Sequence, residues 1–286
     1  MCRLFALTAA PAHVSATFWL LEAPHSLISQ SNRNPDGTGI GYFEDGTPVI
    51  DKQPLRASED VAFARDAKLV SSTTFVSHIR FATMGRKTRE NCHPFTMDGR
   101  IFAHNGVVGS MEKLEAHLGN DLARVRGQTD SERFFALITK EIDASSGDVL
   151  TGIVNAVRWT VEHLPVQSLN FVMTTPLELW ALRYPETDTL FIREREGGGP
   201  HGDRPLNYAS SSLAVHSTHA SEKPTVVIAS ERLDDSLDWR SLESGELIHV
   251  AADLSVTSTM IVGGSPRFRL SSFHVLASWL KRMFTA

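Results

Sequence analysis

The chain begins MCRLFALTAAP, residues 1–11, and this stretch sets a cysteine directly ahead of a strand-like run. The residues after Cys2 turn apolar almost at once, so we expect a β-strand that starts next to the first residue. Such a strand holds the amino end in the fold and fixes the direction of Cys2. The only other cysteine in the 286 residues is Cys92.

The composition is that of an ordinary globular protein. Hydrophobic residues make up 42% and charged residues 21%, with a formal net charge of -5. There is no basic excess for a nucleic acid partner, and no apolar run approaches the roughly 20 residues of a membrane span. Two cysteines cannot form a disulfide framework and the start does not resemble a signal peptide, so we expect the reducing cytoplasm.

The order of expected elements predicts an α+β fold. A helix is expected from Val14 to about Ile28, and Asp45-Gly46 reads as a hairpin turn between two strands. Three helices are expected between residues 109 and 164. Helices gathered among hairpin-linked strands favour stacked antiparallel sheets covered by helices over a doubly wound parallel sheet.

The second half of the chain reads mostly as strands. We expect a β-rich region over residues 166–272, interrupted by a surface loop at GGGPHGDRP, residues 197–205. A closing helix over residues 274–283 carries apolar pairs four apart, which favours docking on the chain's own core. We expect residues 1–286 to form a single domain. No glycine-rich phosphate-binding motif is present, so no nucleotide cofactor is expected.

Cys2 becomes a candidate nucleophile if Met1 is removed. It would then carry a thiol, with a pKa of about 8.5, and a free α-amine, with a pKa of about 7.7–8.0. Part of the amine is unprotonated at neutral pH and can take the thiol proton, an arrangement used in acyl-enzyme chemistry. The plainer interpretation is an ordinary second residue, so other residues must point to the same site.

Two further stretches offer groups that suit such a nucleophile. VSHIRFATMG, residues 76–85, holds Arg80 within a strand, where the charge needs a partner. In FAHNGVVG, residues 102–109, we expect a strand to end with the pair Asn105-Gly106, whose amide and backbone N–H are suited to an oxyanion hole, although a plain Asn-Gly turn is an equally common alternative. His78 and His104 are expected to be packed or capping residues.

GQTDSERFF, residues 127–135, adds an acid at the start of an expected helix. Asp130 there is either an N-cap or a group that holds an ammonium ion, and both roles are compatible. A cationic Arg80 and an anionic Asp130 flanking one thiol would suit a free amino-acid end, with its α-carboxylate and α-ammonium.

Six motifs, in order and spacing, resemble the class II glutamine amidotransferase domain. Such domains are N-terminal nucleophile hydrolases, which implies a four-layer αββα fold of two stacked antiparallel sheets between helical layers. The motifs cover about residues 1–135, and the β-rich remainder carries no signature of its own. They are Cys2-Arg3, RNPDGTG (33–39), HIRFATMG (78–85), NCHPF (91–95), HNG (104–106) and TDSE (129–132).

The resemblance assigns roles to individual residues. Cys2 matches the nucleophile, and Asn105 with Gly106 matches the oxyanion hole. Arg80 matches the residue that binds the glutamine α-carboxylate, and Asp130 the acid that holds the α-ammonium. In addition, Thr83 and His93 match positions lining the glutamine pocket, and Arg33 and Asp36 match a loop that supports the amino terminus.

The sequence also departs from the family. Phe81, Met84 and Cys92 stand where many members have Trp, His and a small residue, which affects substrate preference more than chemistry. The chain has no room for the acceptor domain of the large amidotransferases. It is similar to stand-alone members, including those that hydrolyse a γ-glutamyl amide in ergothioneine biosynthesis.

These expectations combine into one leading hypothesis. The protein is an amidohydrolase that cleaves glutamine or a γ-glutamyl amide through a thioester on Cys2, after which water releases glutamate. The alternatives are a glutaminase subunit that delivers ammonia to a separate synthase and a catalytically inert amino-acid-binding module. Either a synthase or a second copy of this chain is compatible as a protein partner. No cofactor or metal is expected, since the spacing of His78, Cys92, His93 and His104 matches no compact zinc pattern.

Overall fold

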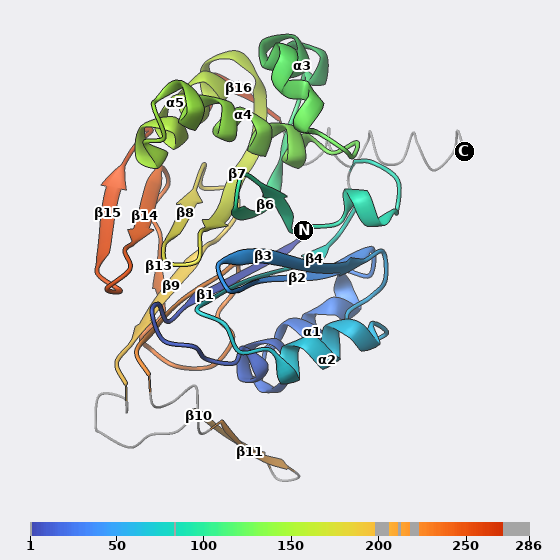
Figure 1. Cartoon of the computed structure of the whole chain (residues 1–286), viewed down its shortest axis with the longest axis vertical. Coiled ribbons are helices and arrows are strands. Elements are labelled where there is room, and N and C mark those ends of the chain that lie inside the picture. Colours follow the sequence, from blue (N-terminus) through green and yellow to red (C-terminus); the bar gives the residue numbers. More distant parts are fainter. Residues whose placement is uncertain (1, 83, 198–205, 211–212, 218–222, 271–286) are drawn as a thin grey trace.

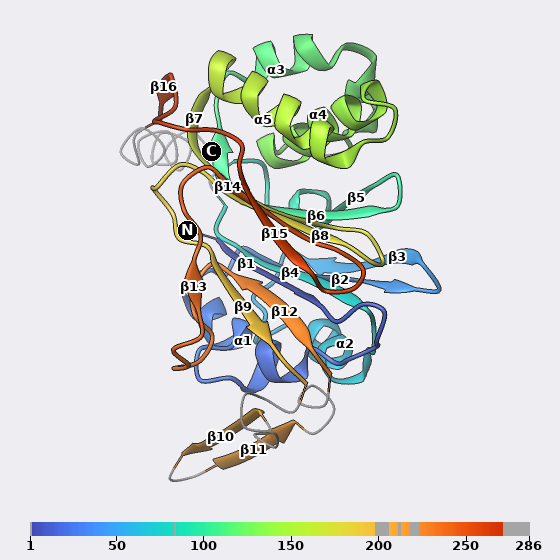
Figure 2. The ribbon, with the colours of Figure 1, turned by 90° about the vertical axis from the view of Figure 1, so that its left-hand side faces the viewer.

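Two antiparallel β-sheets stack face to face, and helices cover the outer side of each (Figure 1). The computed structural model describes residues 2–82, 84–197, 206–210, 213–217 and 223–270. A view from the side shows the same succession of helices, sheet, sheet and helices (Figure 2). The α+β architecture with four αββα layers is therefore confirmed. The predicted closing helix at 274–283, and the predicted loop beyond Gly197, lie outside the described residues.

The first sheet has β1 at its centre, so the residue before β1 lies at the middle of one sheet end. β1 pairs antiparallel with β4 on one side and β12 on the other. The hairpin predicted at Asp45-Gly46 is confirmed, and both residues have positive φ, 48° and 76°. In spatial order the strands are β13 (Arg240–Ser241), β9 (Phe191–Arg195), β12 (Thr225–Ala229), β1 (Arg3–Thr8), β4 (Thr74–Arg80), β2 (Gly37–Glu44) and β3 (Thr47–Gln53).

The second sheet supplies the surface that faces the start of β1. Its long central pair is β6 with β7, and β16 (Phe268–Arg269) joins the start of β7 in parallel. A separate hairpin consists of β10 (Leu206–Ser210) and β11 (Leu213–Ser217). In spatial order the strands are β15 (Val256–Met260), β14 (Glu246–Val250), β8 (Leu179–Arg183), β7 (Pro165–Thr174), β6 (Arg100–Val108) and β5 (Phe95–Met97).

Helices cover the two sheets unequally, and the second sheet carries the longer ones (Figure 1). The three helices predicted between residues 109 and 164 are confirmed. Over the second sheet lie α3 (Met111–Leu118), the 3-10 turn η4 (Gly119–Arg124), α4 (Asp130–Ala144) and α5 (Val149–His163). Over the first lie the π-helical turn η1 (Phe18–Glu22), α1 (Leu27–Gln30), the 3-10 turn η2 (Ser31–Arg33) and α2 (Val61–Leu69).

The prediction of one helix from Val14 to Ile28 is wrong. η1 ends at Glu22, and Ala23 is extended, with φ -57° and ψ 151°, before α1 begins at Leu27. Pro24 explains the break, because its ring disfavours helical geometry at the residue before it. The sequence analysis also missed α2, whose N-cap is Asp60.

The hydrophobic side chains form three layers of core. Leu4 and Ala6 face the layer between the sheets, whereas Phe5 and Leu7 face the helices outside the first sheet. Because side chains alternate along a strand, Cys2 shares the inner face with Leu4. The nucleophile candidate therefore points into the space between the two sheets.

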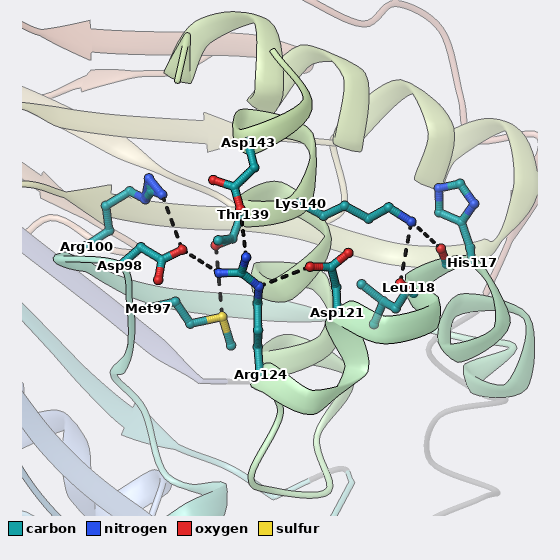
Figure 3. Close-up of polar contacts among 10 residues, drawn as sticks. All are labelled: Met97, Asp98, Arg100, His117, Leu118, Asp121, Arg124, Thr139, Lys140 and Asp143. Carbon is teal, nitrogen blue, oxygen red and sulfur yellow. Dashed lines mark hydrogen bonds and ion pairs between the residues drawn. The ribbon is translucent and has the colours of Figure 1, made fainter. Parts of the chain in front are cut away.

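Polar contacts fasten the helical layer to the edge of the second sheet (Figure 3). Arg124, at the end of η4, contacts three carboxylates: Asp98, Asp121 at 3.1 Å and Asp143 at 2.7 Å. Lys140 of α4 donates to the carbonyl of His117 at 2.5 Å, at the end of α3. Within the described residues, no helix is both long and apolar enough to cross a membrane.

Candidate active site

Cys2 lies against the backbone that follows β4. The N–H of Phe81 donates to Cys2 Sγ at 3.2 Å, and Sγ lies 3.4 Å from the Phe81 carbonyl oxygen. Burial raises the pKa of the Cys2 thiol, and the Phe81 hydrogen bond and the Arg80 charge offset only part of this. The sulfur is therefore held in place as a thiol at neutral pH, and it needs a base to become a nucleophile.

Arg80, the last residue of β4, carries a buried charge. Its Nη2 donates to the Met84 carbonyl at 2.6 Å and its Nη1 to the Arg86 carbonyl at 3.2 Å. Only 3% of the residue is exposed, and no carboxylate lies within ion-pair distance of it among the described residues. Backbone carbonyls orient the guanidinium without neutralising it, so it remains suited to a planar carboxylate.

Asp130 carries the opposite charge in the first turn of α4. Its Oδ2 accepts from the N–H of Val108, at the end of β6, at 2.7 Å. It is 4% exposed, and burial raises its pKa from 3.8 to about 6. Thr129, not Asp130, caps the helix, since its side chain accepts from the N–H of Glu132. Asp130 forms no ion pair within the described part of the chain, so its carboxylate fits an incoming cation.

A short chain of hydrogen bonds connects the segment that holds Arg80 with the segment that precedes Asp130. Asn91 Nδ2 donates to the Arg86 carbonyl at 3.0 Å, and Asn91 Oδ1 accepts from the N–H of Gln128 at 2.7 Å. The turn that holds Arg80 is thereby fastened to the residues just ahead of Asp130. The sequence analysis did not single out Asn91 or Gln128, although both lie in stretches that it quoted, NCHPF and GQTDSERFF.

Asn105 and Gly106 lie within β6, opposite Asn170 and Leu169 of β7. The alternative of a plain Asn-Gly turn is therefore wrong. Asn105 is 5% exposed, and no hydrogen bond to its side-chain amide occurs among the described residues. A Cβ on Gly106 would lie 1.9 Å from the Ser168 carbonyl oxygen, so only glycine fits. The side-chain amide of Asn105 is thus free to bind a ligand, and it adjoins a position at which the close approach of β7 permits only glycine.

Asp36 fixes the segment that follows β4. Its N–H donates to the Arg80 carbonyl at 3.1 Å, its Oδ2 accepts from the Ala82 N–H at 2.9 Å, and it pairs with Lys87 at 2.5 Å. Asp36 therefore supports the backbone against which Cys2 lies. Arg33 ends η2 exposed, and the described residues give it no polar partner. Thr83 lies outside the described residues.

His93 lies in the core behind this site. Its ring packs on His78, with centroids 4.1 Å apart, and on Phe95 at 4.6 Å. Burial holds the pKa of His93 well below its usual value and lowers that of His78 to about 3, so both are neutral at pH 7. No polar atom of the described residues hydrogen-bonds either ring. The predicted role of His93 in lining a glutamine pocket stays a prediction.

The neighbouring Cys92 and His104 are also buried parts of the frame. Cys92 Sγ donates to the Thr88 carbonyl at 3.3 Å, and burial raises the pKa of its thiol. His104 lies 2.9 Å from Ser131 Oγ through Nδ1 and 3.2 Å from the Ser168 carbonyl through Nε2, and burial lowers its pKa to about 4. In the described ranges, no three His, Cys, Asp or Glu side chains are arranged to hold a metal ion.

Comparison with known proteins identifies the family. The model of the class-II glutamine amidotransferases matches residues 1–263. The chain belongs to this family. Its chemistry is hydrolysis of the glutamine side-chain amide. The members are enzymes, and the resemblance found in the six motifs is confirmed.

Relatives include both short and long chains. The chain is 26% identical to the probable glutamine amidotransferase DUG3 of Saccharomyces cerevisiae, covering 87% of this chain and 82% of that one. It is 32% identical to glutamine–fructose-6-phosphate aminotransferase of Aquifex aeolicus, but over 44% of this chain and only 21% of the relative.

Two solved structures share the fold. A glutamine aminotransferase class-II domain protein from Silicibacter pomeroyi superimposes with a TM-score of 0.61 at 20% identity, covering 92% of this chain and 100% of that one. The glutamine phosphoribosylpyrophosphate amidotransferase of B. subtilis gives 0.63 at 19% identity, covering 92% of this chain and 50% of the other. This chain thus has the N-terminal nucleophile hydrolase fold.

Proposed function

We propose that this protein is an amidohydrolase that cleaves glutamine or a γ-glutamyl amide through a thioester on Cys2. The observation that supports this most strongly is the pair of buried, uncompensated charges. Arg80 is a cation without a carboxylate, and Asp130 an anion without a cation, within the described residues. Their opposite signs match the α-carboxylate and α-ammonium of a glutamyl group, whose side chain would reach toward Cys2.

The first chemical step uses the α-amine that Cys2 carries once Met1 is removed. The amine takes the thiol proton, and Sγ attacks the carbonyl carbon of the amide. A C–S bond forms while the carbonyl π electrons move to the oxygen. The side-chain amide of Asn105 and the N–H of Gly106 would stabilise that oxyanion, and losing one such donor typically costs about 2.7–4 kcal/mol in the barrier.

The second step returns the enzyme to its starting state. The tetrahedral intermediate collapses, the C–N bond breaks, and the ammonium of Cys2 gives its proton to the leaving nitrogen. Water, deprotonated by the same amine, then attacks the thioester. The C–S bond breaks, glutamate leaves, and the thiolate takes the proton back from the ammonium. The mechanism needs no cofactor. It requires a reduced thiol, so we propose that the protein acts in the reducing cytoplasm.

Covalent labelling tests the nucleophile. An electrophilic analogue of glutamine should add one equivalent to the protein, and peptide mapping should place it on Cys2 with Met1 absent. Cys92 is the internal control, since it is a second, buried thiol. Label on Cys92 instead, full activity in Cys2→Ala, or a retained Met1 would contradict the proposal, and a retained Met1 would favour the inert binding module.

A panel of amides tests the leaving group. Glutamate release should be measured from glutamine and from γ-glutamyl amides with larger amines. Faster release from a larger amide supports a stand-alone hydrolase. Slow release from every amide, increased by an added synthase, would instead indicate a glutaminase subunit.

A further inference from the structure

A buried carboxylate, Asp188, has no role in the site described above. It is 3% exposed and lies in the connection between β8 and β9. Its backbone carbonyl accepts from Asn170 Nδ2 at 3.2 Å and from Arg183 Nε at 2.9 Å. Side chains of β7 and β8 therefore hold this residue in place.

The carboxylate of Asp188 is only half satisfied. Its Oδ2 accepts from Gln167 Nε2 at 3.1 Å, whereas its Oδ1 is buried without a hydrogen-bond partner in the described part of the chain. Burial raises its pKa, and Gln167, Ser168 and the charge of Arg3 offset part of this. A buried acceptor without a donor is costly, so Oδ1 is placed to receive one.

The backbone of β1 shows where the nitrogen of Cys2 points. Leu4 N–H donates to Ser230 Oγ at 2.9 Å, and Ser230 N–H donates to the Leu4 carbonyl at 3.0 Å, so the backbone groups of Leu4 face the β12 side. Backbone direction alternates along a strand, so Cys2 N faces the same side. Arg3 agrees with this, since its guanidinium contacts both the Cys2 carbonyl and Glu231, just beyond β12.

Asp188 lies on that same side. The hydroxyl of its neighbour Thr189 donates to the Ser230 carbonyl at 2.8 Å, and Ser230 is the residue that faces Leu4. The sulfur of Cys2 is instead bonded on the β4 side, at Phe81. The sulfur of Cys2 is thus held at the Phe81 backbone, whereas its nitrogen is directed toward the β12 side of the sheet, where Thr189 ties the Asp188 segment to Ser230.

We propose that Asp188 is a positioning residue that orients the α-amine of Cys2 and stabilises its ammonium form while it carries the thiol proton. The inference rests on the proposed function, because it takes this amine as the base. No proton passes to Asp188: the amine holds the proton until it gives it to the leaving nitrogen, as the imidazole does beside the carboxylate of a Ser-His-Asp triad. Asp188 thereby favours proton transfer from the thiol without touching substrate.

Asp188→Asn tests this role, because the amide keeps the shape and can still accept from Gln167. We expect kcat for glutamine to fall about 10- to 100-fold while KM stays within about twofold. The acidic limb of the kcat/KM profile should move down by about one pH unit, since an opposite charge raises the pKa of the amine. Asp235→Asn is the matched control, because Asp235 is an exposed carboxylate in the same hollow as Thr189, the neighbour of Asp188. Mass spectrometry must show Met1 removed in every variant.

A second measurement does not depend on turnover. The rate of Cys2 alkylation by iodoacetamide, followed against pH, reports the thiol and the amine beside it, and its midpoint should shift in Asp188→Asn but not in Asp235→Asn. An unchanged kcat and pH limb in a folded Asp188→Asn, with wild type active, would overturn the role of Asp188 alone. Absence of glutamate release by wild type from glutamine and from every γ-glutamyl amide tested would instead refute the proposed function.

Discussion

Arg80 and Arg124 are two arginines whose surroundings differ in one decisive respect. Arg124 is 31% exposed at its side chain and contacts three aspartates: Asp121 and Asp143 in the helical layer, and Asp98 in the turn between β5 and β6. Arg80 is 3% exposed, its guanidinium donates to the carbonyls of Met84 and Arg86, and it pairs with no carboxylate among the described residues. The first charge is neutralised by the protein and the second is not.

On the proposed function, this difference separates a structural cation from one that binds substrate. A buried charge without a counterion lowers the stability of the fold. Either the folded protein bears that cost, or a ligand of opposite charge neutralises the buried group. Asp130 repeats the pattern with the opposite sign. The four predictions that follow sharpen the contrast, from the largest expected effect to the smallest.

Replacing Arg80 should have the largest effect. In Arg80→Met the substrate carboxylate loses its charge-assisted bonds, which we expect to lower kcat/KM for glutamine more than about 100-fold, or about 3 kcal/mol. Steady-state kinetics check this. Arg80→Lys keeps the charge but loses the paired N–H donors of the guanidinium, and it should retain part of the activity. Equal activity of a folded Arg80→Met and wild type would remove Arg80 from the site.

Asp130→Asn should lower activity and raise stability together. Loss of the partner for the ammonium is expected to reduce kcat/KM about 10- to 100-fold. The unliganded fold should gain up to about 3 kcal/mol at pH 8, because the carboxyl pKa of about 6, against 3.8 unfolded, makes its ionised form unfavourable when folded. Urea unfolding at pH 8 and pH 4 measures this, and a gain that persists at pH 4 would contradict the cause.

The affinity for glutamine should depend on pH through Asp130. The carboxylate is charged above its pKa of about 6 and neutral below it. KM should therefore rise about tenfold for each pH unit below 6 and level off above 7. Initial rates across pH 5 to 8 at varied glutamine test this. In Asp130→Asn that rise should vanish, and its persistence there would assign the titration to another group.

Arg124→Met should have the smallest effect. Partly exposed ion pairs contribute about 0.2–1 kcal/mol each, so we expect a modest fall in Tm that shrinks in high salt, with kcat/KM unchanged. Calorimetry at low and high salt, together with kinetics, measures both. A loss of turnover comparable with that of Arg80→Met would show that the contrast between the two arginines does not hold.

The sequence predicts much of the fold because its strand and hairpin signals are local. The turn at Asp45-Gly46 and the helices after residue 109 were found from short patterns. The helix from Val14 was predicted wrongly because its apolar spacing outweighed Pro24. α2 was missed because Val61 and Leu69 are exposed, which blurs its apolar face.

Only the site residues that lie in sequence motifs could be predicted. Cys2, Arg80, Asn105 and Asp130 each stand in a recognisable stretch. The hydrogen bonds that connect them join residues far apart in sequence, such as Asn91 with Gln128. Asp188 lies in no motif, and its contacts, to Gln167 and through Thr189 to Ser230, join three separate parts of the chain. Such pairings depend on tertiary packing, which local patterns do not encode.

The most direct test of the central claim is a crystal structure of Cys2→Ala soaked with glutamine. The proposal predicts the α-carboxylate on the Arg80 guanidinium, the α-ammonium at Asp130, and the side-chain carbonyl oxygen directed at Asn105 and Gly106. Glutamine bound elsewhere, or bound in this space without contacting Arg80 and Asp130, would contradict it.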